Sequence, residues 1–198
     1  MNDDDYVELV NTMRTNESEH QKQTIIDKIQ HTTELIDKCI LCRYYLSPLS
    51  TNMEKILRND LQIGGPLNNT SGDGHKNGVN YEIKYSGHTK RSTLNFVQIR
   101  PDHDIDYYIL VCYNMYAGDK GSAHILKVPA NDVYDMVVKY GEYAHGTKKH
   151  LGAIDKSSLT GNNNEYSLRC NPNTKKGKNH DLWNILRAYE VTYSPENF

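Results

Sequence analysis

The sequence predicts a fold of the α/β (α+β) class. A helical region comes first, and a central mixed β-sheet flanked by helices follows. Three observations support this fold class. Apolar residues of the first 46 positions recur at helical spacing, residues 79–85 (VNYEIKY) alternate with period two, and residues 106–115 (DYYILVCYNM) form an apolar, β-rich run. The 198 residues suit one core over residues 49–198, preceded by a helical region over residues 1–48.

The helical region is expected to run from residue 6 to residue 46. Its apolar residues fall near i, i+3, i+4 and i+7 spacing: Ile25, Ile26, Ile29, Leu35, Ile36, Ile40 and Leu41. Thr32 and Thr33 mark a weak point, and Pro48 ends the region. A second, short helix is predicted over residues 50–61, with Ser50 or Thr51 as its N-cap.

The remaining elements follow the alternation of apolar and polar residues. We expect a strand over residues 79–85, a central strand over residues 106–115, and a hairpin that returns over residues 122–128 through a turn at 118–121. The other expected elements are a short helix near 92–99, a helix over 133–140, a polar segment over 144–180, a short helix over 181–186 and a final strand over 188–193.

The charges are unevenly distributed along the chain. The net charge is −2, but residues 1–73 carry 7 Lys/Arg against 12 Asp/Glu, and residues 74–198 carry 16 against 13. Phosphate binding needs a locally basic face, for which the total charge is a poor guide. The positive excess of the second part therefore permits a nucleic-acid partner.

The location of the protein is inferred from segments that the sequence lacks. No apolar run approaches the ~20 residues of a membrane span, and the acidic start (MNDDD) is not typical of a secretory signal. We expect a soluble, cytoplasmic protein with reduced cysteines. Cys39 and Cys42 form a CxxC, but no second pair completes a zinc site, which favours buried thiols over a metal.

The strand over residues 79–85 carries the chemistry. Period two places Asn80, Glu82 and Lys84 on one face, and Asp73 precedes them across a Gly-rich loop, so the pattern reads D-x8-E-x-K. Mg²⁺ prefers one or two carboxylates, waters and a phosphate oxygen, which Asp73 and Glu82 match, and the carbonyl of Ile83 points to the same region. Lys84 is placed to hold or deprotonate an attacking water. The alternative is a solvated, salt-bridged face of an edge strand.

The segment from Asp73 to Tyr113 resembles the core of the PD-(D/E)xK nucleases, and within them the PvuII type of small restriction enzyme. The YEIK strand, and the block NFVQIRP followed by DYYIL, carry the resemblance. It implies Mg²⁺-dependent cleavage of DNA, with Asp73 and Glu82 as metal ligands, Lys84 as the catalytic lysine and Glu54 as an auxiliary acid. The chain departs from the family pattern at Gly72, where the motif has proline, and its C-terminal third carries no resemblance.

Candidate DNA contacts are the residues that supply hydrogen bonds to base edges and phosphates. They are Gln98, Arg100, His103, Asn162, Asn163, Asn164, Arg169, Asn171 and Asn173, with Lys148, Lys149, Lys175, Lys176 and Lys178 as phosphate contacts. The N-terminal helix is expected to pair with its twin in a homodimer that matches a palindromic site, although packing on its own sheet is the alternative. No phosphate-cradling GxxxxGK[ST] motif is present, so ATP is not expected.

The function that these patterns favour is a type II restriction endonuclease of a prokaryotic cell, which cleaves a short double-stranded DNA sequence with Mg²⁺. Three alternatives stay open. The first is a repair or recombination nuclease that recognises DNA shape, such as a junction resolvase. The second is a non-catalytic DNA-binding module on the same fold. The third is an ordinary α/β protein with an accidental E-x-K.

Overall fold

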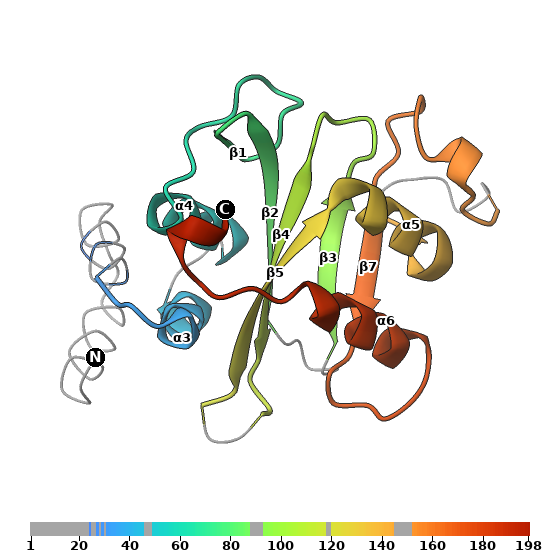
Figure 1. Ribbon diagram of the computed structural model, residues 1–198. Helices are drawn as coiled ribbons and strands as arrows, with labels where there is room; N and C mark the ends of the chain where they lie inside the picture. The colour runs from blue at the N-terminus through green and yellow to red at the C-terminus, as the bar shows by residue number, and fades with distance from the viewer. Residues whose placement is uncertain are drawn as a thin grey trace.

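The computed structural model describes residues 24, 27, 29, 31–45, 49–87, 93–117, 120–144 and 152–198. Figure 1 shows a four-stranded mixed sheet with helices on one face and a second, three-stranded sheet with further helices beyond the other face. This arrangement confirms the predicted fold class.

The four-stranded sheet has the order β1–β2–β4–β5. Its strands are β1 (Gly74–Lys76), β2 (Val79–Gly87), β4 (Tyr107–Asn114) and β5 (Ser122–Pro129). Strands β2 and β4 run parallel, whereas the β1–β2 and β4–β5 pairs are antiparallel. The predicted strand over 79–85, the central strand and the hairpin are therefore confirmed.

The second sheet was not predicted. It has the order β3–β7–β6, with β3 (Leu94–Ile99), β7 (Tyr166–Cys170) and β6 (Glu142–Tyr143). The expected helix near 92–99 is wrong, because this segment is β3. Its alternation is interrupted by a bulge at Gln98, which has a φ of 58° and shifts the register between Phe96 and Ile99. The bulge hid the period-two pattern of a strand, and the short β7 lies inside the segment expected to be polar.

The helices of the described residues are α3 (Leu35–Tyr45), α4 (Leu49–Asp60), α5 (Ala130–Tyr140) and α6 (Lys178–Leu186), with 3-10 turns η1 (Lys156–Ser158), η2 (Arg187–Tyr189) and η3 (Pro195–Asn197). Residues 32–34 are not helical, which confirms the weak point at Thr32 and Thr33. Helix α4 begins at Leu49, so Ser50 and Thr51 lie inside the helix and not at the position before it. Within the described part of the chain, no helix has the length and apolar character needed to cross a bilayer.

The predicted final strand over 188–193 is also wrong. The chain forms η2 and then only an isolated bridge between Glu190 and Leu126, with the Val191 N–H donating to the Ile125 carbonyl at 3.0 Å. Beyond this point the chain leaves β5 and crosses to α4 and β1, where Phe198 is buried against Tyr81. The Tyr193 hydroxyl donates to Asp60 and the Pro195 carbonyl accepts from Lys76, so these residues lie against α4 and β1 and do not continue the pairing with β5.

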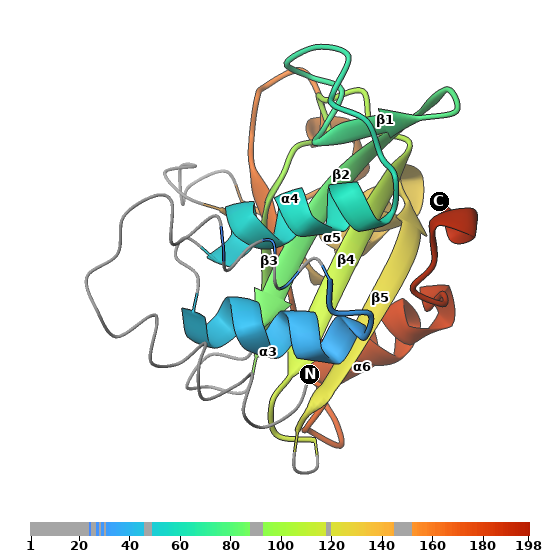
Figure 2. The same ribbon diagram turned by 90° about the vertical axis from the view of Figure 1, so that its left-hand side faces the viewer.

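Two cores lie on the two faces of the four-stranded sheet. Tyr81, Ile83, Ile109 and Val111 pack with α3 and α4 in the first core, which Figure 2 shows as two helices lying over one face of the sheet. The second core joins the opposite face of β4 and β5 to β3, β7, α5 and α6. Strand alternation therefore sends Glu82 and Lys84 toward the second sheet.

The apolar residues of α3 are buried in the first core of the same chain. Cys39 and Cys42 are free thiols and fully buried there, which confirms the buried-thiol interpretation of the CxxC. The buried face of α3 is thus committed to its own sheet. The homodimer and the division at residue 48 stay predictions, and residues 1–23 lie outside the described part.

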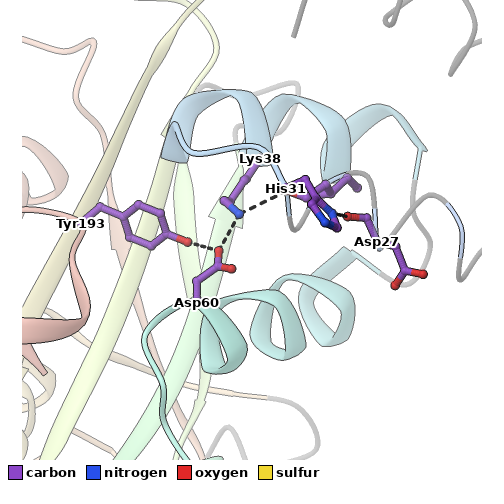
Figure 3. A network of polar contacts seen from close by, with 6 residues as sticks. Asp27, His31, Lys38, Asp60 and Tyr193 are labelled. Atoms are coloured by element: carbon purple, nitrogen blue, oxygen red, sulfur yellow. Dashed lines mark hydrogen bonds and ion pairs between the residues drawn. The ribbon is translucent and has the colours of Figure 1, made fainter.

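A buried polar network ties α3, α4 and the C-terminal segment together (Figure 3). Lys38 of α3 is 2% exposed, and its Nζ lies 2.6 Å from the Asp60 carboxylate and donates to the Ile29 carbonyl at 3.2 Å. The Tyr193 hydroxyl donates to the same carboxylate. This network fixes the end of α4, the helix that carries Glu54.

Candidate active site

Asp73 is held against the edge of β2 by two hydrogen bonds. Its backbone N–H donates to the Tyr81 carbonyl at 2.8 Å, and its carboxylate accepts from the Ile83 N–H at 2.8 Å. The carboxylate thus takes the place of a backbone carbonyl and extends the β1–β2 ladder by one step. On the other side, Arg58 of α4 donates to the Asp73 carbonyl at 3.0 Å. These bonds fix both the backbone and the side chain of Asp73.

The glycines on either side of Asp73 make this close approach feasible. Gly72 has a φ of +75°, and a Cβ there would lie 2.5 Å from the Tyr81 carbonyl oxygen and 2.7 Å from Ile105. Proline, with φ fixed near −65°, cannot adopt this conformation. A Cβ at Gly74 would lie 2.5 Å from Ile63. The glycine that departs from the family motif is therefore required by the backbone of this chain.

Glu82 and Lys84 form an ion pair on the face of β2 that faces the second sheet. Their side chains are 9% and 13% exposed. The alternative of a salt-bridged edge face predicted such a pair, but a solvated one, and this pair is buried. Asn80, the third polar residue of the face, has a structural role. Its side chain donates to the Asp104 carbonyl at 2.9 Å, and its backbone N–H donates to the Asp106 carboxylate at 2.8 Å.

Glu54 on α4 shares this region, because Asp73 and Glu82 both act on its ionisation. Burial raises the pKa of Glu54 to about 7, with Asp73 and Glu82 adding to the rise and Lys84 and Arg58 opposing it. Burial also raises the pKa of Glu82, a rise that Asp73 enhances and Lys84 opposes. The negative charge of Asp73 thus adds to the raised pKa values of both Glu54 and Glu82. Such a site suits an added cation.

The oxygen ligands available at this edge of β2 are of the kind that Mg²⁺ prefers. The N–H and C=O of one residue point to the same side of a strand, so the Ile83 carbonyl faces the edge at which its N–H meets Asp73. Two carboxylates and a carbonyl, completed by water, are ligands that Mg²⁺ accepts. Among the described residues, no group of three or more His, Cys, Asp or Glu side chains is placed to hold a metal. The predicted set of Asp73, Glu82 and the Ile83 carbonyl contains only two such side chains, and it stays a prediction.

Several predicted DNA contacts gather at the same end of the molecule as the catalytic candidates. Arg100 is among the charges that oppose the burial-driven rise in the pKa of Glu82, and burial together with Arg100 and Lys84 lowers the pKa of His103. The backbone N–H groups of residues 161–163 donate to the carboxylate of Asp102, which places Asn162–Asn164 beside Arg100 and His103. Gln98 is exposed at the bulge of β3.

The other predicted contacts lie elsewhere. Strand β7 pairs Tyr166 with Ile99 and Cys170 with Leu94, so the segments before and after β7 leave at opposite ends, separated by about 14 Å of strand. Lys175, Lys176 and Lys178 are exposed and follow β7, at the end remote from Arg100. Arg169 pairs with Glu142 at 3.1 Å. The predicted contacts before and after β7 therefore lie in two separate places, and their role in DNA binding stays a prediction.

The predicted asparagine contacts after β7 have structural roles. The side chain of Asn171 is buried and accepts from the Asn173 N–H at 2.9 Å. The amides of Asn173 and Asn114 bond each other reciprocally, each at 3.1 Å. Lys148 and Lys149 lie outside the described residues.

Sequence reasoning missed four residues around the site. Glu165 binds Arg100, and Asp102 holds the loop of residues 161–163. Tyr108 lies opposite Glu82 in the β2–β4 register, and burial together with Tyr134 of α5 raises its pKa. These contacts join segments distant in sequence, so no local spacing signals them. The register alone, once β2 and β4 were aligned in parallel, would have placed Tyr108 beside Glu82.

The sequence matches no protein-family model and no curated protein.

Proposed function

We propose that this chain is a Mg²⁺-dependent endonuclease of the PD-(D/E)xK class that hydrolyses phosphodiester bonds of double-stranded DNA. One observation carries the proposal: Asp73, fixed between two glycines, bonds the strand that bears the buried Glu82–Lys84 pair. Two carboxylates and a lysine near one another can supply the cation ligands and the proton-handling group that metal-assisted phosphodiester hydrolysis uses.

Asp73, Glu82 and the Ile83 carbonyl would hold the cation. When bound, Mg²⁺ would supply charge neutralisation at the phosphate and a lowered pKa for a water. The ammonium of Lys84 is placed on the same face as Glu82, where it can donate to a water or to a phosphate oxygen. Glu54, with its pKa near 7, can accept or release a proton at neutral pH.

The finer proposal is a type II restriction endonuclease that acts as a homodimer on a short sequence. The resemblance of residues 73–113 to small restriction enzymes supports it, as does the set of hydrogen-bonding side chains beside the catalytic candidates: Gln98, Arg100, His103 and Asn162–Asn164. The alternatives are a nuclease that recognises DNA shape, and a DNA-binding module without catalysis.

Incubation of the purified protein with linear phage DNA and with branched duplex DNA, in Mg²⁺ and in EDTA, separates these functions. Discrete fragments of the linear DNA in Mg²⁺ alone are the expected result. Cleavage confined to the branched DNA would support the shape-selective nuclease. Binding without cleavage under any divalent cation would contradict the nuclease proposal and favour the binding module.

A further inference from the structure

Arg100 is held by a carboxylate of its own chain, Glu165. Its Nε donates to Oε1 of Glu165 at 2.8 Å, and its Nη2 lies 2.7 Å from the same oxygen. Two N–H groups on one edge of a guanidinium form the fork that binds carboxylate and phosphate alike. The contact therefore shows a geometry that suits an anionic oxygen of either kind.

The position of Arg100 places this fork beside the proposed chemistry. Arg100 opens a turn in which the His103 N–H donates to its carbonyl at 3.1 Å, and the next residue, Asp104, accepts at 2.9 Å from the side chain of Asn80 on the strand that bears Glu82. Its side chain is 36% exposed, so a ligand can reach it from solvent. A phosphodiester at the Glu82–Lys84 pair would thus come within the range of this guanidinium, which the free protein keeps on Glu165.

The loop that carries Glu165 does not depend on this ion pair. Asp102 accepts from the Gly161 N–H at 2.6 Å and from the Asn163 N–H at 2.8 Å, bonds that lower the pKa of Asp102 and keep it ionised. The Glu165 carbonyl accepts from the Ala144 N–H at 2.8 Å. Because these backbone bonds fix the loop, the Glu165 side chain is free to serve another purpose.

We propose that Glu165 occupies, in the free protein, the place of a DNA phosphate on Arg100, and that the two anions exchange when DNA binds. The inference rests on the proposed function. It adds Arg100 as a phosphate-binding residue and Glu165 as the carboxylate that competes with the phosphate. Every DNA that reaches the site must displace Glu165, so the competitor weakens electrostatic binding of DNA at large. Arg100 is by this account a phosphate contact and not the base-reading residue expected from the sequence.

The test measures the affinity of a labelled, mixed-sequence DNA duplex for the full chain in EDTA, over a series of salt concentrations. Glu165→Gln is expected to bind about two- to fivefold more tightly, the range expected for releasing a partly exposed ion pair. Arg100→Gln is expected to bind more weakly, and the slope of log K against log salt is expected to flatten by about 0.9. In the Arg100→Gln background, the Glu165→Gln change is expected to have no effect.

Asp135→Asn is the matched control, because Asp135 belongs to an exposed ion pair with Lys156, and neither residue is a candidate DNA contact. An equal gain in DNA affinity in this variant, or a gain from Glu165→Gln that persists in the Arg100→Gln background, would show that the loss of any negative charge has the same effect. Either result would overturn the inference. Weaker binding by Glu165→Gln and by Glu165→Ala, both with unchanged melting temperatures, would also overturn it. If wild type nevertheless cleaves duplex DNA in Mg²⁺, the proposed nuclease function stands and only the role of Glu165 is rejected. If wild type neither binds nor cleaves DNA, both the nuclease function and the role of Glu165 are rejected.

Discussion

The carboxylate of Asp73 accepts a hydrogen bond from the Ile83 N–H at 2.8 Å, in the position where a neighbouring strand would present a carbonyl. One acidic side chain thereby completes the sheet edge and stands beside the Glu82–Lys84 pair. The two roles of Asp73, structural and chemical, are separable because an amide oxygen can accept the same bond without the charge.

Asp73→Asn is therefore expected to keep the fold and lose the activity. The amide oxygen can still accept from Ile83, so the free energy of unfolding should change by less than about 1 kcal/mol. The loss of a metal-binding charge should lower Mg²⁺-dependent cleavage by about 100-fold or more. Urea unfolding and a cleavage assay of the same preparation measure the two effects. A variant that unfolds at much lower urea would show that the charge itself is structural.

Gly72 and Gly78 offer a matched pair of substitutions. Both have positive φ, but a Cβ at Gly72 would lie 2.5 Å from the Tyr81 carbonyl oxygen, whereas a Cβ at Gly78 meets nothing within 4 Å. Gly78→Ala should cost about 1 kcal/mol of stability from backbone strain alone. Gly72→Ala should cost about 2–4 kcal/mol because the clash adds to the strain, and it should also lower cleavage by moving Asp73. Equal unfolding midpoints for the two variants would contradict this account.

Glu54 predicts a pH dependence of stability. Its pKa of about 7 in the folded protein lies above the ordinary value of 4.5, so the folded state binds more protons between these pH values. The free energy of unfolding contributed by this group therefore falls as pH rises from about 4.5 to 7 and stays low above that. Glu54→Gln should be as stable as wild type near pH 4.5 and about 1–2 kcal/mol more stable at pH 8, after allowance for solvent screening.

Denaturant unfolding in EDTA across this pH range, wild type beside Glu54→Gln, measures the difference. Parallel stability curves for the two proteins would show that Glu54 keeps an ordinary pKa and does not share the site with Asp73 and Glu82.

Lys38 predicts a large loss of stability when it is truncated. It is 2% exposed and pairs with Asp60, which also accepts from Tyr193. Lys38→Ala leaves the Asp60 carboxylate without its cation in a buried place and should cost about 3–5 kcal/mol. Lys156→Ala, which removes an exposed partner of Asp135, should change stability by less than about 0.5 kcal/mol. Similar melting temperatures for both variants would argue that the buried pair is dispensable.

The sequence was sufficient for the parts of the fold that have local periodicity. Strand β2, the β4–β5 hairpin and helices α4 and α5 follow from the spacing of their apolar residues. Strand β3 was taken for a helix because the bulge at Gln98 breaks its alternation, and β7 was missed inside a polar segment.

In the candidate site too, residues with a local sequence pattern were predicted and residues joined only by tertiary contacts were not. The D-x8-E-x-K spacing predicted Asp73, Glu82 and Lys84 as site residues. The structure has Asp73 just before β1, bonded to the Ile83 N–H of β2, the strand that carries the Glu82–Lys84 pair. The partners that cross between the sheets, Glu165 on Arg100 and Asp102 on residues 161–163, come from tertiary contacts without a local pattern. Strand β7 separates the predicted C-terminal DNA contacts into two groups, and their contact with DNA stays a prediction.

The central claim is that Asp73, Glu82 and Lys84 form a Mg²⁺-dependent nuclease site. Its most direct test compares the rate of duplex DNA cleavage by wild type, Lys84→Ala and Glu82→Gln, with Lys156→Ala and Asp135→Asn as controls from an exposed ion pair. The account predicts cleavage by wild type and both controls in Mg²⁺, none in EDTA, and at least about 100-fold slower cleavage by the two site variants. Undiminished cleavage by folded Lys84→Ala and Glu82→Gln, or no cleavage by wild type with any divalent cation, would contradict it.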